Sequence, residues 1–157
     1  MNINEKVISS IPSKCLGCKQ CELICSYLHE KSYSPRLARI KVVHFVDKGL
    51  SVPVTCAYCD QPVCEEVCPV GAMTHNPVTG AARVKEELCI GCKECVNACP
   101  LGAVDMHPLK GVALRCDLCD GDPACVKYCP VKALKYEPLY IGVKSKRRSR
   151  VEAWHLE

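Results

Sequence analysis

Four groups of four cysteines constrain the fold of this chain more than any other feature of its sequence. They account for all 16 cysteines among the 157 residues, a share typical of disulfide scaffolds and metal carriers. Charged and small polar residues lie between the cysteines, so we infer that the groups hold something instead of filling an apolar core. The groups are Cys15, Cys18, Cys21 and Cys25; Cys56, Cys59, Cys64 and Cys68; Cys89, Cys92, Cys95 and Cys99; and Cys116, Cys119, Cys125 and Cys129.

The amino terminus argues against a disulfide scaffold. Disulfides need an oxidising compartment, which a chain usually reaches through a signal peptide. Residues 1–14 have no positively charged start, no apolar run of useful length and no cleavage site. No apolar stretch reaches about 18 residues, so we expect no membrane span. These features predict a cytoplasmic protein, unless a signal-bearing partner exports it.

The spacing of the cysteines indicates the bound group. The first and third groups have the spacing C-x-x-C-x-x-C-x-x-x-C, and the second and fourth widen the middle gap. This is the bacterial ferredoxin run that binds [4Fe–4S] clusters. Three cysteines on a tight loop can ligate one cluster, while the fourth points away and ligates the neighbouring cluster. With no cysteine left over, the sequence predicts four [4Fe–4S] clusters.

Zinc is the competing metal, because Cys₄ zinc sites would also use every thiol. Zinc sites usually pair two C-x-x-C units across a longer gap, and they do not need a fourth cysteine followed by proline. A zinc module that binds nucleic acid through the basic run at residues 144–150 is therefore the alternative from a different functional class. Such a module would interleave basic and aromatic residues across the domain. Here the basic residues are concentrated in one tail, so we expect no nucleic-acid partner.

Glycines, prolines and apolar runs around the cysteines predict the local structure. Gly17 and Gly91 lie between the first two cysteines of their groups, where the backbone must approach the cluster closely. Residues 39–45 and 51–55 are predicted to form a β-hairpin, and a second turn is expected at residues 75–81. Prolines follow three of the fourth cysteines and are predicted to start helices there: Pro69, Pro100 and Pro130.

On these motifs the chain resembles the four-cluster ferredoxin-type electron-transfer subunits of multi-subunit redox enzymes. The resemblance covers about residues 12–140, and its carriers are the cysteine groups, "SPRLARIKV" after the first and "RCDLCDGDPACVKYCPVKAL" at the fourth. Members of the family serve molybdenum- or tungsten-pterin enzymes of the dimethyl sulfoxide reductase and formate dehydrogenase types, and carbon monoxide dehydrogenase–hydrogenase systems. In size and in the fourth motif, the chain looks similar to the small subunit of tungsten aldehyde oxidoreductase complexes.

The resemblance also implies which cysteines share a cluster, because the family nests two ferredoxin modules in one sequence. The implied ligands are Cys15, Cys18, Cys21 and Cys129 for cluster 1; Cys116, Cys119, Cys125 and Cys25 for cluster 2; Cys56, Cys59, Cys64 and Cys99 for cluster 3; and Cys89, Cys92, Cys95 and Cys68 for cluster 4. Ser26 stands where the family pattern would have a proline. That departure leaves the ligand Cys25 intact and bears on the turn after it.

The implied fold is α+β, with two nested bacterial-ferredoxin-like modules, short helices, short strands and many loops. A β-hairpin is inserted between the modules. We assign residues 1–12 to an N-terminal arm, 13–30 with 110–140 to the outer module, 31–55 to the hairpin insertion, 56–109 to the inner module and 141–157 to a basic C-terminal tail.

The expected function is electron relay, without a catalytic site of the chain's own. The implied partners are a large pterin-containing subunit of a tungsten or molybdenum aldehyde-type oxidoreductase and a downstream flavoprotein or ferredoxin. Neither a P-loop nor a G-x-G-x-x-G motif occurs, so the sequence suggests no nucleotide or flavin site. The alternatives are a diffusible polyferredoxin and a subunit of a formate dehydrogenase, hydrogenase or carbon monoxide dehydrogenase system.

Other side chains near the cysteines have predicted roles. Four lysines are candidates for raising cluster potentials: Lys19, Lys93, Lys127 and Lys132. Three tyrosines are expected to pack over the clusters and shield them from water: Tyr27, Tyr58 and Tyr128. The histidines lack metal-ligand spacing and are expected in surface or packing positions: His29, His44, His75, His107 and His155.

The two ends of the chain are either disordered tails or docking arms. Val7, Ile8 and Ile11 form a small apolar set with no evident place in the modules, and Trp154 is a candidate anchor beyond the basic run. A stand-alone ferredoxin would need neither arm, so the arms favour a complex subunit. They also allow self-association.

Overall fold

Strand pairing joins distant parts of the chain in the computed structural model. The structure describes residues 6–59, 61–76, 80–139 and 141–142. Within these residues the strands form four antiparallel pairs. The pairs are β1 (Lys6–Ser10) with β8 (Leu134–Pro138), β2 (Lys41–Phe45) with β3 (Leu50–Val54), β4 (Met73–His75) with β5 (Ala82–Val84), and β6 (Val104–Met106) with β7 (Ala113–Arg115).

The α-helices that contain the third cysteine of each group are short. They are α1 (Gln20–Glu30), α2 (Val63–Glu66), α3 (Glu94–Ala98) and α4 (Ala124–Lys127). Short 3₁₀ segments lie between them: η1 (Pro12–Lys14), η2 (Pro35–Leu37), η3 (Val46–Lys48) and η4 (Leu118–Gly121). Helix α1 packs against α4, and α2 packs against α3.

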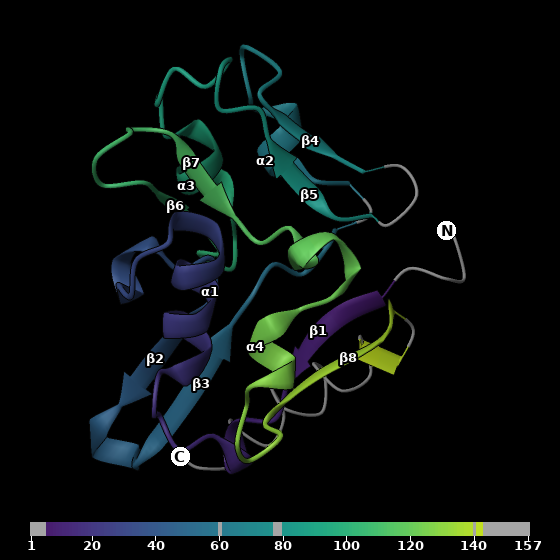
Figure 1. Cartoon of the computed structure of the whole chain (residues 1–157). Coiled ribbons are helices and arrows are strands. Elements are labelled where there is room, and N and C mark those ends of the chain that lie inside the picture. Colours follow the sequence, from purple (N-terminus) through teal and green to yellow (C-terminus); the bar gives the residue numbers. More distant parts are fainter. Residues whose placement is uncertain (1–5, 60, 77–79, 140, 143–157) are drawn as a thin grey trace.

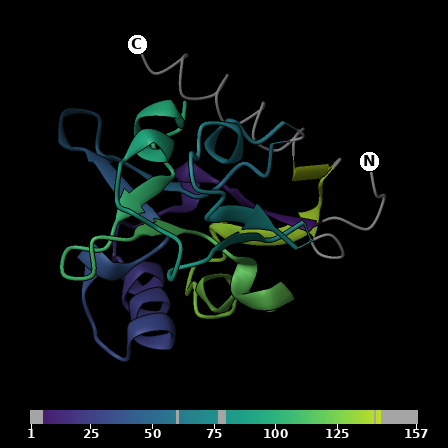
Figure 2. The ribbon, with the colours of Figure 1, turned by 90° about the horizontal axis from the view of Figure 1, so that it is seen from above.

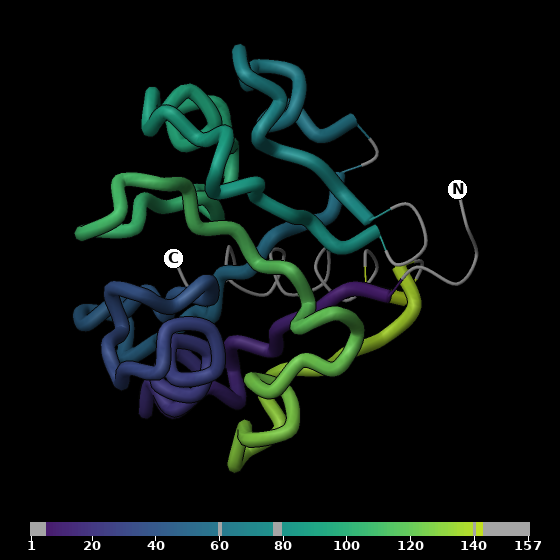
Figure 3. The backbone as a smooth tube through the Cα atoms, turned by 45° about the horizontal axis from the view of Figure 1, so that its top comes forward, coloured from purple at the N-terminus to yellow at the C-terminus, as the bar shows by residue number. Residues whose placement is uncertain are grey.

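These elements gather into two lobes (Figure 1). The inner lobe consists of α2, α3 and strands β4 to β7, and the outer lobe consists of α1, α4, β1, β8 and the β2–β3 hairpin. The tube view shows the same division (Figure 3). Strand β7, which we predicted to lie in the outer module, pairs with β6 and therefore belongs to the inner lobe. The α+β fold of short helices and hairpins is as predicted.

Prolines start two of the helices, but they are not the prolines that we predicted. Pro62 and Pro123 precede α2 and α4 directly. The prolines after the fourth cysteines begin turns, because Gly71, Gly102 and Lys132 donate their N–H groups back to the carbonyls of the fourth cysteines. The prediction that Pro69, Pro100 and Pro130 start helices is therefore wrong.

Ser26 explains why α1 is longer than the other helices. A proline at this position would end the helix at Cys25, but serine lets it continue to Glu30. The Ser26 side chain is fully buried, and its Oγ donates to the carbonyl of Leu23 and accepts the N–H of Ser34. Serine in place of the family's proline at position 26 thus extends α1 where a turn would otherwise begin.

The N-terminal apolar residues have a place in the fold. Strand β1 pairs with β8 along its length, and Val7 and Ile8 are each 1% exposed. The two strands lie side by side when the molecule is seen from above (Figure 2). Residues 6–10, which we predicted to be part of an arm, thus form an integral strand of the outer lobe.

The β2–β3 hairpin has the predicted strands, joined through η3 and Gly49. Glu22 in α1 fixes the hairpin to the outer lobe, because its buried Oε1 accepts the backbone N–H of Val42 at 2.6 Å. The expected turn at residues 75–81 connects β4 and β5, although residues 77–79 lie outside the described part. None of the helices in the described residues has both the length and the hydrophobicity that a membrane crossing needs.

Candidate metal centres

Two of the four implied cysteine sets line pockets. In the outer lobe, a pocket of about 320 Å³ is lined by Cys15, Cys18, Cys21 and Cys129. In the inner lobe, a pocket of about 340 Å³ is lined by Cys68, Cys89, Cys92 and Cys95. Each pocket takes three cysteines from one group and the fourth from a group that is distant in sequence. This is the arrangement implied for clusters 1 and 4.

The structure also brings together most members of the other two sets. Burial raises the pKa of Cys125, and the neighbouring thiolates of Cys116, Cys25 and Cys119 raise it further. Burial likewise raises the pKa of Cys64; Arg115 opposes this change, and the nearby thiolates of Cys56 and Cys99 add to it. Cys59, the remaining member of this last set, is exposed.

The cysteine sets fit a positively charged metal group. Burial, reinforced by neighbouring negative charges, raises the pKa of Cys21 to about 12 and that of Cys95 to about 11. Sulfurs that face one another in a low-dielectric pocket ionise readily only when positive charge lies between them. Iron supplies that charge, and cysteine thiolates are the ligands of [4Fe–4S] clusters.

Backbone N–H groups point at the fourth cysteines. Ala103 donates to Cys99 Sγ at 3.4 Å, and Ala133 donates to Cys129 Sγ at 3.2 Å, each four residues after the cysteine. Burial would raise the pKa of Cys68, but backbone N–H groups that follow it lower its pKa overall. Cys25 lies within α1, and its Sγ accepts a hydrogen bond from the backbone N–H of Arg39, outside the helix, at 3.3 Å. Such donors stabilise negative charge on sulfur and thereby raise a cluster's reduction potential.

The four C-x-x-C loops share one backbone feature, a left-handed residue just before the second cysteine. Glycine fills this position in the first and third groups, with φ values of 67° at Gly17 and 69° at Gly91. Tyr58 (φ 53°) and Leu118 (φ 59°) fill it in the second and fourth. A residue with a side chain costs about 1 kcal/mol in this conformation. The left-handed backbone at Gly17 and Gly91 agrees with the predicted need for glycine at these two positions, and the other two loops adopt the same conformation without glycine.

The two non-glycine loops meet where the lobes join. The Tyr58 hydroxyl donates to Cys116 Sγ at 3.1 Å and lies 3.2 Å from the carbonyl oxygen of the same residue. In the opposite direction, the Arg115 guanidinium interacts with the Cys56 thiol and donates to Glu65 Oε1 at 3.1 Å. The implied sets of clusters 2 and 3 are the central ones. Tyr58, next to Cys59 of the cluster 3 set, contacts the cluster 2 set, and Arg115, next to Cys116 of the cluster 2 set, contacts the cluster 3 set.

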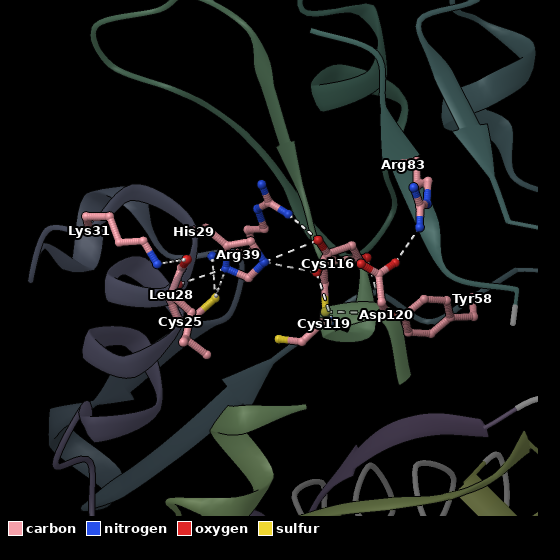
Figure 4. A network of polar contacts seen from close by, with 11 residues as sticks. Cys25, Leu28, His29, Lys31, Arg39, Tyr58, Arg83, Cys116, Cys119 and Asp120 are labelled. Atoms are coloured by element: carbon pink, nitrogen blue, oxygen red, sulfur yellow. Dashed lines mark hydrogen bonds and ion pairs between the residues drawn. The ribbon is translucent and has the colours of Figure 1, made fainter. Parts of the chain in front are cut away.

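A half-buried polar network surrounds the set that contains Cys25 (Figure 4). His29 Nε2 lies 3.1 Å from Asp117 Oδ1, and Arg39 donates to the other carboxylate oxygen at 2.5 Å. Burial alone would lower the pKa of His29, but Asp117 and Cys25 raise it to about 10. Burial would raise the pKa of Asp117, but His29 and Arg39 lower it to about 2. We predicted only a surface or packing role for His29, since its partners are distant in sequence.

The ligand atoms of His29, Asp117 and Cys119 lie within 4.8 Å of one another, close enough to hold a metal ion. However, Asp117 already accepts hydrogen bonds from His29, Arg39 and the Cys119 backbone. We therefore assign these residues to the surroundings of the cysteine set and not to a separate metal site.

The three tyrosines predicted to pack over clusters have different settings. The Tyr58 hydroxyl is hydrogen-bonded to the Cys116 sulfur. Tyr27 is 39% exposed and stacks on Tyr33 with ring centroids 4.6 Å apart. Tyr128 is 55% exposed. Adjacency to a cysteine in sequence does not show which way a ring points.

The lysines lie mostly at the surface. Lys19 is half-buried, and Lys93, Lys127 and Lys132 are exposed. Lys127 forms an ion pair with Asp122, and Lys132 Nζ lies 3.4 Å from the Lys127 carbonyl. Lys19 and Lys93 nevertheless line the two cysteine pockets. Arg115, which we did not predict, is a further cationic side chain beside cysteine sulfurs.

The other histidines have varied settings. His44 and His75 are exposed and contact Ser51 and Glu65, as expected of surface residues. His107 is buried: its Nδ1 accepts backbone N–H groups, and its Nε2 lies 3.3 Å from Glu30. The predictions for His155, Trp154 and the basic run concern residues outside the described part of the chain.

The paired cysteine sets and the two-lobed α+β fold define an iron–sulfur protein of the ferredoxin type. Residues 48–138 match the family model described as a 4Fe-4S dicluster domain, and residues 12–28 match that of a 4Fe-4S binding domain. The chain therefore belongs to the 4Fe-4S dicluster family, and its cysteines are consistent with four clusters.

Curated relatives share this pattern. Over 107 residues the chain is 43% identical to the aliphatic sulfonate oxidoreductase, polyferredoxin-like subunit, of Pyrococcus furiosus, covering 68% of this chain and 61% of that protein. Over 119 residues it is 35% identical to one subunit of the anaerobic dimethyl sulfoxide reductase of Escherichia coli K12, covering 67% of this chain and 57% of that protein. The chain thus spans less than two thirds of the length of these relatives.

A solved structure shows the same fold. One chain of the active site complex BamBC of benzoyl-coenzyme A reductase aligns with a TM-score of 0.52 and 29% identity. The alignment covers 89% of this chain and 87% of that one. The likeness thus extends over both lobes.

Proposed function

We propose that this chain relays electrons through four [4Fe–4S] clusters, between a tungsten- or molybdenum-pterin catalytic subunit and a downstream redox partner. The names of its relatives support the proposal. They describe a polyferredoxin-like subunit of an oxidoreductase, a subunit of a dimethyl sulfoxide reductase and a component of an active site complex.

The observation that carries the proposal is a continuous row of cysteine sets through both lobes. Cys21 of the first implied set lies close enough to Cys125 of the second to raise its pKa, after burial and the nearer thiolates. In the same way, Cys56 of the third set lies close enough to Cys116 of the second to raise its pKa, although burial is again the main cause. Cys64 and Cys95, from the third and fourth sets, belong to one buried cluster. Such a row suits stepwise electron transfer.

The cysteines of each implied set would hold one cluster, and the chain's other groups would set its potential. The N–H groups directed at Cys99, Cys129 and Cys25 favour the reduced form. The apolar surroundings of the buried sulfurs exclude water and favour the less charged form. An aldehyde-type oxidoreductase is the catalytic partner that we propose, with a flavoprotein or ferredoxin as acceptor.

Iron analysis with paired substitutions tests the cluster assignments. Protein purified without oxygen should contain about 16 irons, negligible zinc and a brown absorption that dithionite bleaches. Cys15→Ser and Cys129→Ser should remove the same spectroscopic centre, although the two residues lie more than a hundred positions apart. Loss of two different centres would overturn the nested pairing, and a colourless zinc protein would overturn the relay.

Co-purification tests the partner. A tagged chain isolated from its native host under anaerobic conditions should bring down a large protein that contains tungsten or molybdenum. An aldehyde added to that complex should bleach the brown absorption. If the chain is isolated alone and still accepts electrons from several donors, a diffusible polyferredoxin becomes the better description. Bleaching by formate, hydrogen or carbon monoxide would instead indicate one of the other family systems.

A further inference from the structure

The two central cysteine sets, at the junction between the lobes, differ from the two end sets in the residue type at one backbone position. Just before the second cysteine of each group the backbone is left-handed, and glycine adopts this conformation without steric cost. The two end sets use glycine there, at Gly17 and Gly91. The two central sets instead use Tyr58 and Leu118, whose side chains make this conformation unfavourable. These two side chains are therefore expected to make contacts that compensate for the unfavourable backbone conformation.

The glycines at the ends face neighbouring segments of their own lobes. A Cβ atom at Gly91 would come within 2.5 Å of the carbonyl oxygen of Gly111. A Cβ atom at Gly17 would come within 2.6 Å of Ser51 Oγ and 2.8 Å of His44 Cε1. In these two loops neighbouring segments occupy the space that a side chain would need.

At the junction the corresponding side chains connect the lobes. Leu118 is fully buried in the outer-lobe core, and Tyr58 packs against the same core although it belongs to the loop between Cys56 and Cys59. The phenol of Tyr58 reaches the sulfur of Cys116 at 3.1 Å. In Figure 4 Tyr58 lies on the far side of Cys116 from His29 and Arg39. Tyr58 thus lies in the ligand loop of one central set and is hydrogen-bonded to the other.

We propose that Tyr58 is a positioning residue that couples the two central clusters across the lobe junction. This inference rests on the proposed relay function. The O–H of Tyr58 donates to the Cys116 sulfur and stabilises the additional negative charge that reduction places on the outer-lobe central cluster. At the same time the half-buried ring would hold the loop of Cys56 and Cys59 at a fixed distance from Cys116.

Tyr58 itself undergoes no redox change in this role. Electron transfer between the two central clusters would form and break no covalent bond, and the phenol of Tyr58 would keep its proton. Burial, together with the neighbouring charges of Cys116 and Cys56, raises the pKa of Tyr58 well above its ordinary value, which agrees with a permanent donor.

Tyr58→Phe tests the coupling, because it removes the hydroxyl and keeps the ring. The variant should retain about 16 irons. In a redox titration followed by electron paramagnetic resonance, one midpoint potential should move to a more negative value while the other three stay unchanged. The shifted centre should be the one that Cys25→Ser lacks, because Cys25 and Cys116 belong to the same implied set.

Tyr128→Phe is the matched control. It removes a phenolic hydroxyl next to a cysteine in sequence, but this ring is 55% exposed. It should leave all four potentials at their wild-type values. Rapid-mixing reduction should also show several-fold slower equilibration between the lobes in Tyr58→Phe, and unchanged equilibration in Tyr128→Phe.

The outcomes separate this inference from the relay itself. If wild-type protein holds four clusters and accepts electrons but Tyr58→Phe titrates like wild type, the coupling role is overturned and the relay stands. A shift equal in both tyrosine variants would also overturn it. If wild-type protein holds no iron, the relay and the coupling role both fail.

Discussion

Arg115 is a nearly fully buried cation in a protein whose ligands are anionic. It is 4% exposed, donates to Glu65 and lies beside Cys56 and Cys64. Burial would lower its pKa, but the nearby thiolates and Glu65 raise it, so the charge is permanent. Such a charge next to cysteine sulfur stabilises the reduced form of the cluster that those cysteines are proposed to hold.

Replacing Arg115 with Met should lower both stability and potential. The substitution removes the buried partner of the largely buried Glu65 carboxylate and leaves it only the exposed His75, which should lower the free energy of unfolding by about 3 kcal/mol. It should also make one midpoint potential more negative. Anaerobic thermal unfolding and a redox titration measure the two effects.

Arg83→Met is the control for the stability effect. Arg83 pairs with Asp120, and both side chains are more than half exposed. Loss of an exposed ion pair should lower the unfolding free energy by less than about 1 kcal/mol. Equal losses of stability in the two variants would show that burial of Arg115 does not matter.

The sequence was enough to predict which residues are metal ligands, because the chemistry requires cysteines at a set spacing. It was not enough to predict which way a side chain points. The cysteines were predicted as one ligand class because their spacing has few other uses. By contrast, nothing local distinguishes Tyr58 from Tyr128, since each precedes a cysteine directly. The roles of Arg115 and His29 depend on Glu65, Cys56 and Asp117, which only the tertiary fold brings to them.

At the scale of elements, the contact between α1 and the β2–β3 hairpin rests on one buried hydrogen bond. Glu22 is 3% exposed and accepts the Val42 N–H. Glu22→Ala should cost about 2 kcal/mol, because it leaves a buried backbone donor without its partner. Hydrogen exchange at Val42 should then accelerate far more than exchange at Ile8 in β1. Uniform acceleration of both amides would contradict a local role.

Elements that form between neighbouring residues were predictable, and the others were not. The β2–β3 hairpin combines two apolar runs with an intervening turn, so its pattern is local. The β1–β8 pair joins Lys6 to Pro138, and no local pattern links strands so far apart. The helix starts were misassigned because proline also suits the first position of a turn, and the turns after the fourth cysteines use it in that way.

At the scale of the whole molecule, ion pairs hold the two lobes together. Glu30 at the end of α1 contacts Lys110 at 3.0 Å and His107 at 3.3 Å, both beyond β6. Lys41 of β2 also pairs with Asp105 of β6 at 3.2 Å. Burial would raise the pKa of Glu30, but Lys110 and His107 lower it overall. The hydrogen bond that Lys110 donates to the Glu30 carboxylate is the main cause of the raised pKa of Lys110.

These shifts predict a pH window for the stability of the junction. The lowered pKa of Glu30 means that its contribution is present above about pH 4.5, the ordinary value, and is lost as the pH falls through the folded value. Lys110→Met should therefore lower the melting temperature at pH 7 by a few degrees. The difference from wild type should vanish in acid.

The control for this effect is Lys135→Met, on the surface of β8 in the outer lobe. It should have no comparable pH dependence. A Lys110→Met deficit that persisted unchanged below the titration of Glu30 would show that the ion pair is not its cause.

Iron removal should unfold the chain, because both buried clusters of side chains depend on cysteines. The smaller inner-lobe cluster contains two cysteines among its five buried members, and the larger outer-lobe cluster contains six among its fourteen. A chelator added under anaerobic conditions should abolish most far-ultraviolet circular dichroism as the brown colour fades. Retention of the spectrum after complete iron loss would show that the apolar side chains suffice.

The four C-x-x-C loops also limit how such a protein can grow. In the language of polymers, Tyr58 and Leu118 are linkages between repeat units, whereas Gly17 and Gly91 are end groups. At each end group a neighbouring segment of the same lobe fills the space that a linking side chain would use. A longer conductor of this type would therefore need more than a third module joined at its end. It would first have to displace the side chains of His44 and Ser51 at Gly17, or the backbone turn that carries Gly111 at Gly91.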